Sequence, residues 1–411
     1  MSLTASLPAR AWLTVGLLWI VGCLNYLDRV MVATMRGSIK EAIPMTDAQF
    51  GLLTSVFLLV YATLSPFAGF LADRFNRSRV IVGSLFVWSL VTWLTAHAKS
   101  YEQLLLTRAL MGLSEACYLP AAVALIADYH RNSTRSLANG IHLSGVMVGS
   151  ALGGVGGWLA ERHGWAYAFN LFGLVGIGYS CVILVLLRNP ATDDRTVLAE
   201  VGVAPKVRFG EAIVSLFTRP AFVIALIFWG LLGIGGWAVM GWMPTYLNEQ
   251  FKLSQGSAGL SATGYVNVAA LLGMIIGGAW ADRWSRTNPR ARILVPVIGL
   301  CLAAPGILLA STTPVLAVAL AALVCYGLAR SFADANMMPI LCQIADPRYR
   351  ATGYGVLNAF ACYVGAITIY LGGVLRDAHV DISRVFQFAA GSITVCAVLM
   401  YFIRPQPAQQ P

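Results

Sequence analysis

The chain has 411 residues, of which 58% are hydrophobic and 11% charged, and its formal net charge is +10. Ordinary soluble proteins carry roughly 25% charged residues, so this composition excludes a water-soluble surface and indicates a membrane protein. The apolar runs are continuous rather than alternating, which argues against a spanning β-barrel.

Twelve apolar segments are long enough to cross a bilayer, because a spanning helix needs about 20 residues. Their predicted limits are 11–35, 46–71, 79–98, 101–129, 134–161, 165–188, 219–248, 255–283, 291–310, 314–344, 349–376 and 382–404. The first segment carries Asp28 and Arg29, and no small-residue cleavage site follows it. We therefore expect a retained helix rather than a signal peptide.

Positive charges are distributed unevenly between the predicted loops. Most Lys and Arg residues fall on the side of the N-terminus, which predicts that both termini are cytoplasmic and that the chain lies in the cell (inner) membrane. The lipid bilayer is therefore the expected partner, and the positive charge does not indicate nucleic acid. We expect a monomer.

A polar stretch with two prolines divides the twelve segments into six and six. The predicted units are a first half (1–188), a cytoplasmic linker (189–218) and a second half with a short cytoplasmic tail (219–411). Residues 69–77 (GFLADRFNR) and 278–286 (GAWADRWSR) share their first glycine, an alanine, the Asp-Arg pair and the last arginine. Asp128 and Asp346 form a second repeat, each followed by arginines. These repeats predict an all-α membrane protein made of two pseudo-symmetric six-helix bundles.

Glycines form a stripe along the fifth segment. They recur at every fourth position, and the eighth segment has a shorter set: Gly145, Gly149, Gly153 and Gly157, with Gly273 and Gly277. Such stripes let helix backbones approach closely in lipid. Fixed packing between neighbouring helices would explain any one of these glycines, whereas for the whole stripe we expect a smooth contact where the two halves slide or rock.

Three charged residues lie deep in the first half. Asp28 and Arg108 are each about seven residues from the outer ends of their segments, or roughly 10 Å at about 1.5 Å per residue, so they can pair. Glu115 lies two turns deeper on the same helix face as Arg108 and has no partner close in sequence. A charge at the bilayer centre is costly, so such residues usually face a water-filled cavity and serve transport. Burial disfavours the charged form of an acid, so Glu115 is expected to bind and release a proton.

The repeated loop at 69–77 resembles the signature loop of the major facilitator superfamily, and the resemblance covers nearly the whole chain. It implies the major facilitator fold and an inner gate that this loop latches in the outward-open state. Simple anchoring of the topology by arginines is the alternative. The candidate gate residues are Asp73, Arg74, Arg77, Asp128, Asp282 and Arg283.

Residues 25–29 (NYLDR) and 108–116 (RALMGLSEA) resemble the anion:cation symporter family, which includes sugar-acid carriers. Spinster-like carriers of lysolipids and sphingolipids share a similar pattern, so these residues do not separate the two families. The resemblance to the symporters assigns Arg29 to the substrate anion, Tyr26 to its hydroxyl groups, and Asp28 and Glu115 to proton coupling.

Asp28, Arg29, Arg108 and Glu115 sum to zero charge when all are ionised. A proton on either acid leaves the cluster positive and frees an arginine for an anion, which would couple the two in symport. A permanent structural ion-pair network is the alternative. We assign proton coupling to Asp28, Glu115 and Arg108.

The second half offers fewer charges. Arg330 and Asp334 are one helical turn apart, so they are either a self-satisfied pair or substrate ligands. Trp237 is expected to lie either in the interfacial aromatic belt or in the cavity. His142 lies in the first half, where it is expected either to pack in the core or to relay protons. Asn358 matches a polar position that relatives use for substrate. The candidate substrate-binding residues are Asn25, Tyr26, Arg29, Tyr118, His142, Trp237, Trp242, Tyr246, Arg330, Asp334, Asn336 and Asn358.

The sequence lacks the His-Glu-x-x-His, Gly-x-Ser-x-Gly and Walker lysine motifs, so an enzyme or an ATP-driven pump is not expected. The five histidines give no metal-ligand spacing, and no cofactor other than a proton gradient is expected. The predicted function is proton-coupled symport of a small organic anion, such as a sugar acid, by alternating access. The alternative is Spinster-like transport of a lysophospholipid or another amphipathic lipid. A transporter-like sensor is less favoured, because it would need a larger cytoplasmic region.

Overall fold

The computed structural model describes residues 9–130, 134–189, 209–346 and 349–403. Within these ranges twelve helices are long and apolar enough to cross a membrane, which confirms the predicted number and the all-helical class. The first six crossings are α1 (Ala9–Thr34), α3 (Asp47–Arg74), α4 (Arg77–Thr95), α5 with α6 (Tyr101–Glu115 and Tyr118–Tyr129), α7 with α8 (Arg135–Leu152 and Gly154–His163) and α9 (Trp165–Leu186).

Of the first six crossings two are interrupted among the described residues, whereas of the second six one is interrupted and five are continuous. The second six are α12 (Pro220–Phe251), α13 with the π-helical turn η2 and α14 (Gln255–Leu260, Ser261–Tyr265 and Val266–Trp284), α15 (Ala291–Ala310), α16 (Leu316–Ile344), α17 (Arg350–Asp377) and α18 (Ser383–Phe402). Two shorter helices are α2 (Arg36–Ala42) and α11 (Phe209–Phe217). Much of the predicted linker lies outside the described residues, and the boundaries of the two halves stay predictions.

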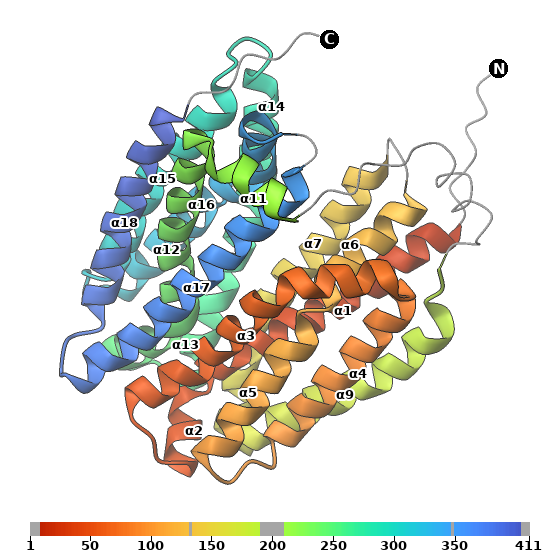
Figure 1. The fold of residues 1–411 in the computed structure, drawn as a ribbon. Helices are drawn as coiled ribbons and strands as arrows, with labels where there is room; N and C mark the ends of the chain where they lie inside the picture. Colours follow the sequence, from red (N-terminus) through yellow and green to blue (C-terminus); the bar gives the residue numbers. More distant parts are fainter. Residues whose placement is uncertain (1–8, 131–133, 190–208, 347–348, 404–411) are drawn as a thin grey trace.

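The helices form two bundles that meet at one end and diverge toward the other (Figure 1). Because twelve crossings reverse direction each time, α1 begins and α18 ends on the same side of the molecule, which we call the terminal side. The bundles meet on the opposite side, where α3 packs along α17 and α13 packs against α8.

Hydrogen bonds between the bundles concentrate toward the opposite side. Asp377 accepts from the backbone N–H groups of Asp47 and Ala48 at 2.8 Å each, so the second bundle caps the start of α3. Further along α3, the Thr63 and Tyr363 hydroxyl groups lie 2.8 Å apart. Between described residues, no hydrogen bond joins the bundles nearer to the terminal side than this one.

Three crossings are interrupted in the described part of the chain. The break between α5 and α6 follows Glu115, and Pro120 has no N–H to donate to the carbonyl of Ala116. The break between α7 and α8 falls at Gly153. In the eighth crossing, the Thr263 hydroxyl of η2 donates to Ala151 of the other bundle at 2.9 Å, and single π-helical turns of this kind are frequent at functional sites.

The glycine stripe packs inside the first bundle, so the expectation of a sliding contact between halves is wrong for most of it. A Cβ on Gly149 would lie 2.1 Å from the carbonyl oxygen of Cys23, and one on Gly145 would lie 2.5 Å from that of Trp19. Both partners belong to α1. Similarly, a Cβ on Gly273 would lie 2.1 Å from the carbonyl of Leu328 in the same bundle. Small residues predict close approach but not the identity of the neighbour.

Candidate functional site

The centre of the first bundle holds a buried ion pair between α1 and α5. Arg29 Nη2 donates to Glu115 Oε2 at 2.9 Å, and the two side chains are 4% and 0% exposed. Asn25 Oδ1 lies 3.5 Å from the same arginine nitrogen. Glu115 therefore has a partner that is distant in sequence, which the sequence could not identify.

Asp28 and Arg108 lie beside this pair but form no ion pair with each other in the described part of the chain, contrary to expectation. The Thr92 hydroxyl is 3.4 Å from Asp28 Oδ2, and Arg108 Nη1 is 3.0 Å from the Met111 sulfur. Both charged side chains are nearly inaccessible. The cluster thus contains one paired acid and one acid with a weak neutral partner.

Several polar atoms of this cluster have no hydrogen-bond partner among the residues that the structure describes. They are Asn25 Nδ2, Asp28 Oδ1, Arg29 Nε, Arg108 Nε and Nη2, and Glu115 Oε1. Buried polar atoms in proteins are almost always paired, so a group of orphans marks a place where strain, water, a proton or a ligand is involved. The two arginines supply free donors, and the two acids supply free acceptor oxygens.

Aromatic rings surround the Arg29 guanidinium. Its Cζ lies 4.4 Å from the Tyr26 ring centroid, 4.8 Å from Phe57 and 4.7 Å from Tyr61. Arg108 approaches the Phe57 ring as well, at 5.2 Å. Phe57 and Tyr61 were not among the predicted site residues, although their spacing of four residues puts them on one face of α3 and was the available signal.

Several polar candidates of the second bundle have a partner within that bundle, although Arg330 Nε has none among the described residues. Arg330 Nη1 donates to Asp334 Oδ2 at 2.8 Å, which is the self-satisfied arrangement, with side chains 24% and 30% exposed. The Asn336 side-chain amide donates to the Phe332 carbonyl at 2.9 Å. Trp242 is fully buried, and its Nε1 donates to the Ile369 carbonyl at 3.0 Å.

Four further substrate candidates lie at α17 or in the core of the first bundle. Trp237 packs on α17, where a Cβ on Gly365 would lie 2.0 Å from its ring. Asn358 is half-buried in α17. The Tyr118 hydroxyl lies 2.8 Å from His142 Nε2, and both residues are inaccessible in the core of the first bundle. Their roles in substrate binding stay predictions.

Three of the candidate gate residues, Arg77, Asp128 and Asp282, form ion pairs within their own bundles. Arg77 pairs with Asp128 of α6, and Arg292 Nη2 donates to Asp282 at 3.1 Å. Arg283 lies in the last turn of α14. Asp73 and Arg74 lie in the last turn of α3, and their side chains are outside the described part of the structure.

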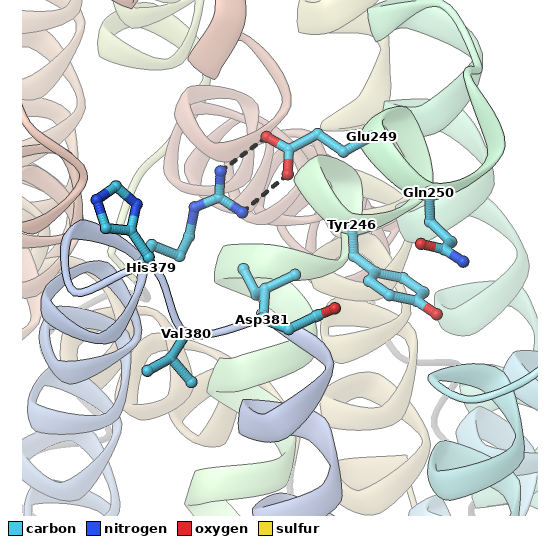
Figure 2. Close-up of a pocket in the computed structure, with 8 residues that line it drawn as sticks. Tyr246, Glu249, Gln250, His379, Val380 and Asp381 are labelled. Atoms are coloured by element: carbon cyan, nitrogen blue, oxygen red, sulfur yellow. Dashed lines mark hydrogen bonds and ion pairs between the residues drawn. The ribbon is translucent and has the colours of Figure 1, made fainter.

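An ionic network closes the opposite side between the bundles. Asp47 of α3 accepts from Arg36 and Lys40 of the first bundle and, at 2.9 Å, from Arg376 Nε of α17. The two terminal nitrogens of Arg376 donate to the Glu249 carboxylate at 2.8 Å each (Figure 2). Arg376 therefore ties α3 and α12 to α17.

This network borders a cavity of about 400 Å³ formed by the ends of α12 and α17 and the loop before α18 (Figure 2). Tyr246 lines it from α12, so this predicted substrate residue lies on the opposite side, away from the charge cluster. Asp381 also lines it, and the backbone N–H of Ser383 donates to its carboxylate at 2.7 Å, which lowers the pKa of Asp381.

The sequence of the chain is similar to one protein family and to individual transporters. The family model described as Major Facilitator Superfamily matches residues 18–369 and 297–411. An MFS-type efflux pump of Mycolicibacterium smegmatis is 28% identical over 389 residues, which cover 91% of this chain and 86% of that protein. Protein spinster homolog 1 of Xenopus tropicalis is 29% identical over 304 residues, 70% of this chain and 58% of that protein, so the match spans little more than half of it.

The fold also matches a solved structure. The crystal structure of a bacterial homolog to the human lysosomal transporter Spinster, in an inward-facing and unoccupied conformation, superposes with a TM-score of 0.77. The match covers 97% of this chain and 96% of that one at 23% sequence identity. At this identity the likeness establishes the fold.

Proposed function

The chain belongs to the Major Facilitator Superfamily, and we propose that this secondary transporter couples protons to the movement of an amphipathic molecule with an anionic head group. The observation that carries the proposal is the buried contact of 2.9 Å between Arg29 and Glu115. Glu115 is an acid that can accept a proton, and Arg29 is a cation that can bind the substrate anion. Because the two side chains are paired, protonation of Glu115 affects anion binding by Arg29 and the reverse.

The coupling follows from the charges of the cluster. Two acids and two arginines balance while all are ionised, and a proton on Glu115 leaves one positive charge in excess. Removing one partner from a buried pair costs about 3–5 kcal/mol, so a lone Arg29 strongly favours a second anion. Deprotonation of Glu115 restores the ion pair and displaces that anion. Asp28, whose Oδ1 has no hydrogen-bond partner in the described ranges, provides a second position for a proton.

The substrate class is inferred from what the second bundle leaves free. A sugar acid needs several unused hydrogen-bonding groups around its hydroxyls, but Asp334, Asn336 and Trp242 already bond within the second bundle. The relatives reported above are Spinster proteins and an efflux pump, which favours the amphipathic alternative over the sugar acid. An arginine for the head group and apolar surroundings for the tail suit a lysophospholipid-like molecule.

The closed network on the opposite side supports a state that opens toward the terminal side. If the termini are cytoplasmic, as the distribution of positive charge predicts, this is an inward-facing state. Alternation would then require the contacts of Asp47 and Asp377 with the other bundle to break while the terminal side closes.

Transport by purified protein in liposomes tests the proposal. We expect an imposed pH gradient to drive movement of a fluorescent lysophospholipid by the wild-type protein, and we expect Glu115→Gln to lose the pH stimulation. Glu102→Gln, a change of the same kind at an exposed position in the first turn of α5, should behave as wild type. Unchanged pH-driven transport by Glu115→Gln would remove this acid from the mechanism, and pH-driven transport of a sugar acid alone would reinstate the anion symporter.

A further inference from the structure

Among the described residues, the Arg29 guanidinium contacts aromatic faces on several sides and the single carboxylate of Glu115. Tyr26 comes from α1, one turn before Arg29, while Phe57 and Tyr61 come from α3 and stack on each other with centroids 6.0 Å apart. Phe57 is inaccessible and Tyr61 is 5% exposed, so the rings exclude water from the guanidinium. A cation over a desolvated ring is held more strongly than one at an exposed ring.

These rings act when Glu115 is neutral. A protonated Glu115 no longer balances Arg29, and a buried unbalanced cation would otherwise leave its position for water or a distant acid. Ring faces attract the cation without taking a proton and without competing for the N–H donors that a head group needs, since they contact the flat surface of the guanidinium. Arg29 Nε is one such free donor.

We propose that Phe57 and Tyr61, with Tyr26, form a cage that positions Arg29 for the substrate anion after Glu115 has accepted a proton. The inference rests on the proposed function and adds residues from a helix that the charge cluster does not include. Phe57 and Tyr61 are positioning residues, because they act through Arg29.

The titratable and charged groups around Arg29 decide how pH affects the cage. They are Glu115 and Arg108 of α5, Tyr26 of α1, Tyr61 of α3 and Cys362 of α17, with Asp28 acting on Glu115. Tyrosine and cysteine stay neutral under acidic conditions, and arginine stays charged. A change of pH on the acid side therefore reaches Arg29 through the two carboxylates.

The cage also lies where the two bundles meet. Ser55 Oγ donates to the Ala366 carbonyl of α17 at 2.6 Å, and Thr63 contacts Tyr363 of α17. Phe57 and Tyr61 fall between these two residues on α3. A movement of α17 along α3 therefore bears directly on the segment that holds the Arg29 guanidinium.

The test compares Tyr61→Leu with Tyr61→Phe in liposomes, with lysophospholipid concentration and external pH both varied. Loss of the ring should raise KM roughly five- to thirtyfold at acid pH, the range of one desolvated cation–π contact, with little change in kcat. Tyr61→Phe keeps the ring and should keep the wild-type KM and pH profile. Phe57→Leu should repeat the effect of Tyr61→Leu and serves if that variant does not fold.

Phe169→Leu is the matched control, because it removes an inaccessible ring of the same bundle that contacts Trp165. Its KM should equal that of wild type. If Glu115→Gln loses pH coupling while Tyr61→Leu and Phe57→Leu keep the wild-type KM and pH profile, the cage is refuted and the proposed function stands. If the wild-type protein itself shows no pH-driven transport, the proposed function fails, and the cage fails with it.

Discussion

Arg376→Ala should release the closed side of the transporter. The arginine donates once to Asp47 and twice to Glu249, and its side chain is 15% exposed, so these bonds are partly shielded from water. Truncating one partner of a hydrogen-bonded, desolvated charge pair costs about 2–5 kcal/mol when burial is complete. Because Glu249 is 42% exposed and Asp47 keeps Arg36 and Lys40, we expect about 2 kcal/mol, or roughly a thirtyfold shift toward opening.

Double electron–electron resonance spectroscopy can measure this shift as a change in the distance between spin labels attached at Lys99 and Arg384. Both are exposed positions next to the opposite side, one in each bundle. In Arg376→Ala a longer distance should become more populated, and Arg376→Lys should give an intermediate result because a lysine cannot make the bidentate contact. Lys252→Gln removes a positive charge at a position without an ion pair among the described residues and should leave the distances unchanged. Identical distance distributions for Arg376→Ala and wild type would refute the role of this network.

Two further predictions concern packing. Gly149→Ala should lower the stability of the purified protein by about 1–3 kcal/mol, because the new Cβ would overlap the Cys23 carbonyl. Gly83 faces open space, so Gly83→Ala is the control and should leave the stability unchanged. Equal melting temperatures for the two variants would contradict the close packing of α7 on α1. Thr263→Val should destabilise the contact between the bundles by about 1–2 kcal/mol, because it removes the hydroxyl that donates to Ala151 and accepts from Gly154. Thr263→Ser keeps a hydroxyl and should keep the stability of the contact. A valine variant as stable as wild type would show that these bonds contribute nothing.

The crossings were predictable because each is a long apolar run, and length alone identifies such a run. Their interruptions were harder to predict. Pro120 is visible in the sequence, but the break at Gly153 and the π-helical turn depend on contacts with other helices. The glycine stripe correctly indicated close approach, yet its neighbour proved to be α1 rather than the other bundle.

The charged site was predictable in composition but not in pairing. Insertion of Arg29 and Glu115 into an apolar helix is costly, which made both residues conspicuous. Which acid meets which arginine depends on the rotation of α1 against α5, and that rotation is not encoded within either segment. Phe57 and Tyr61 escaped notice because an aromatic residue in a spanning helix is unremarkable until a cation lies against it.

The cap that Asp377 places on α3 bears on how the molecule is made. The backbone N–H groups of Asp47 and Ala48 are among the first of their helix and have no carbonyl partner within it. Their acceptor is synthesised some 330 residues later. During insertion, therefore, these N–H groups of α3 must bond to water or another acceptor, and the second helix to enter the membrane acquires its final cap only when nearly the whole chain has been made.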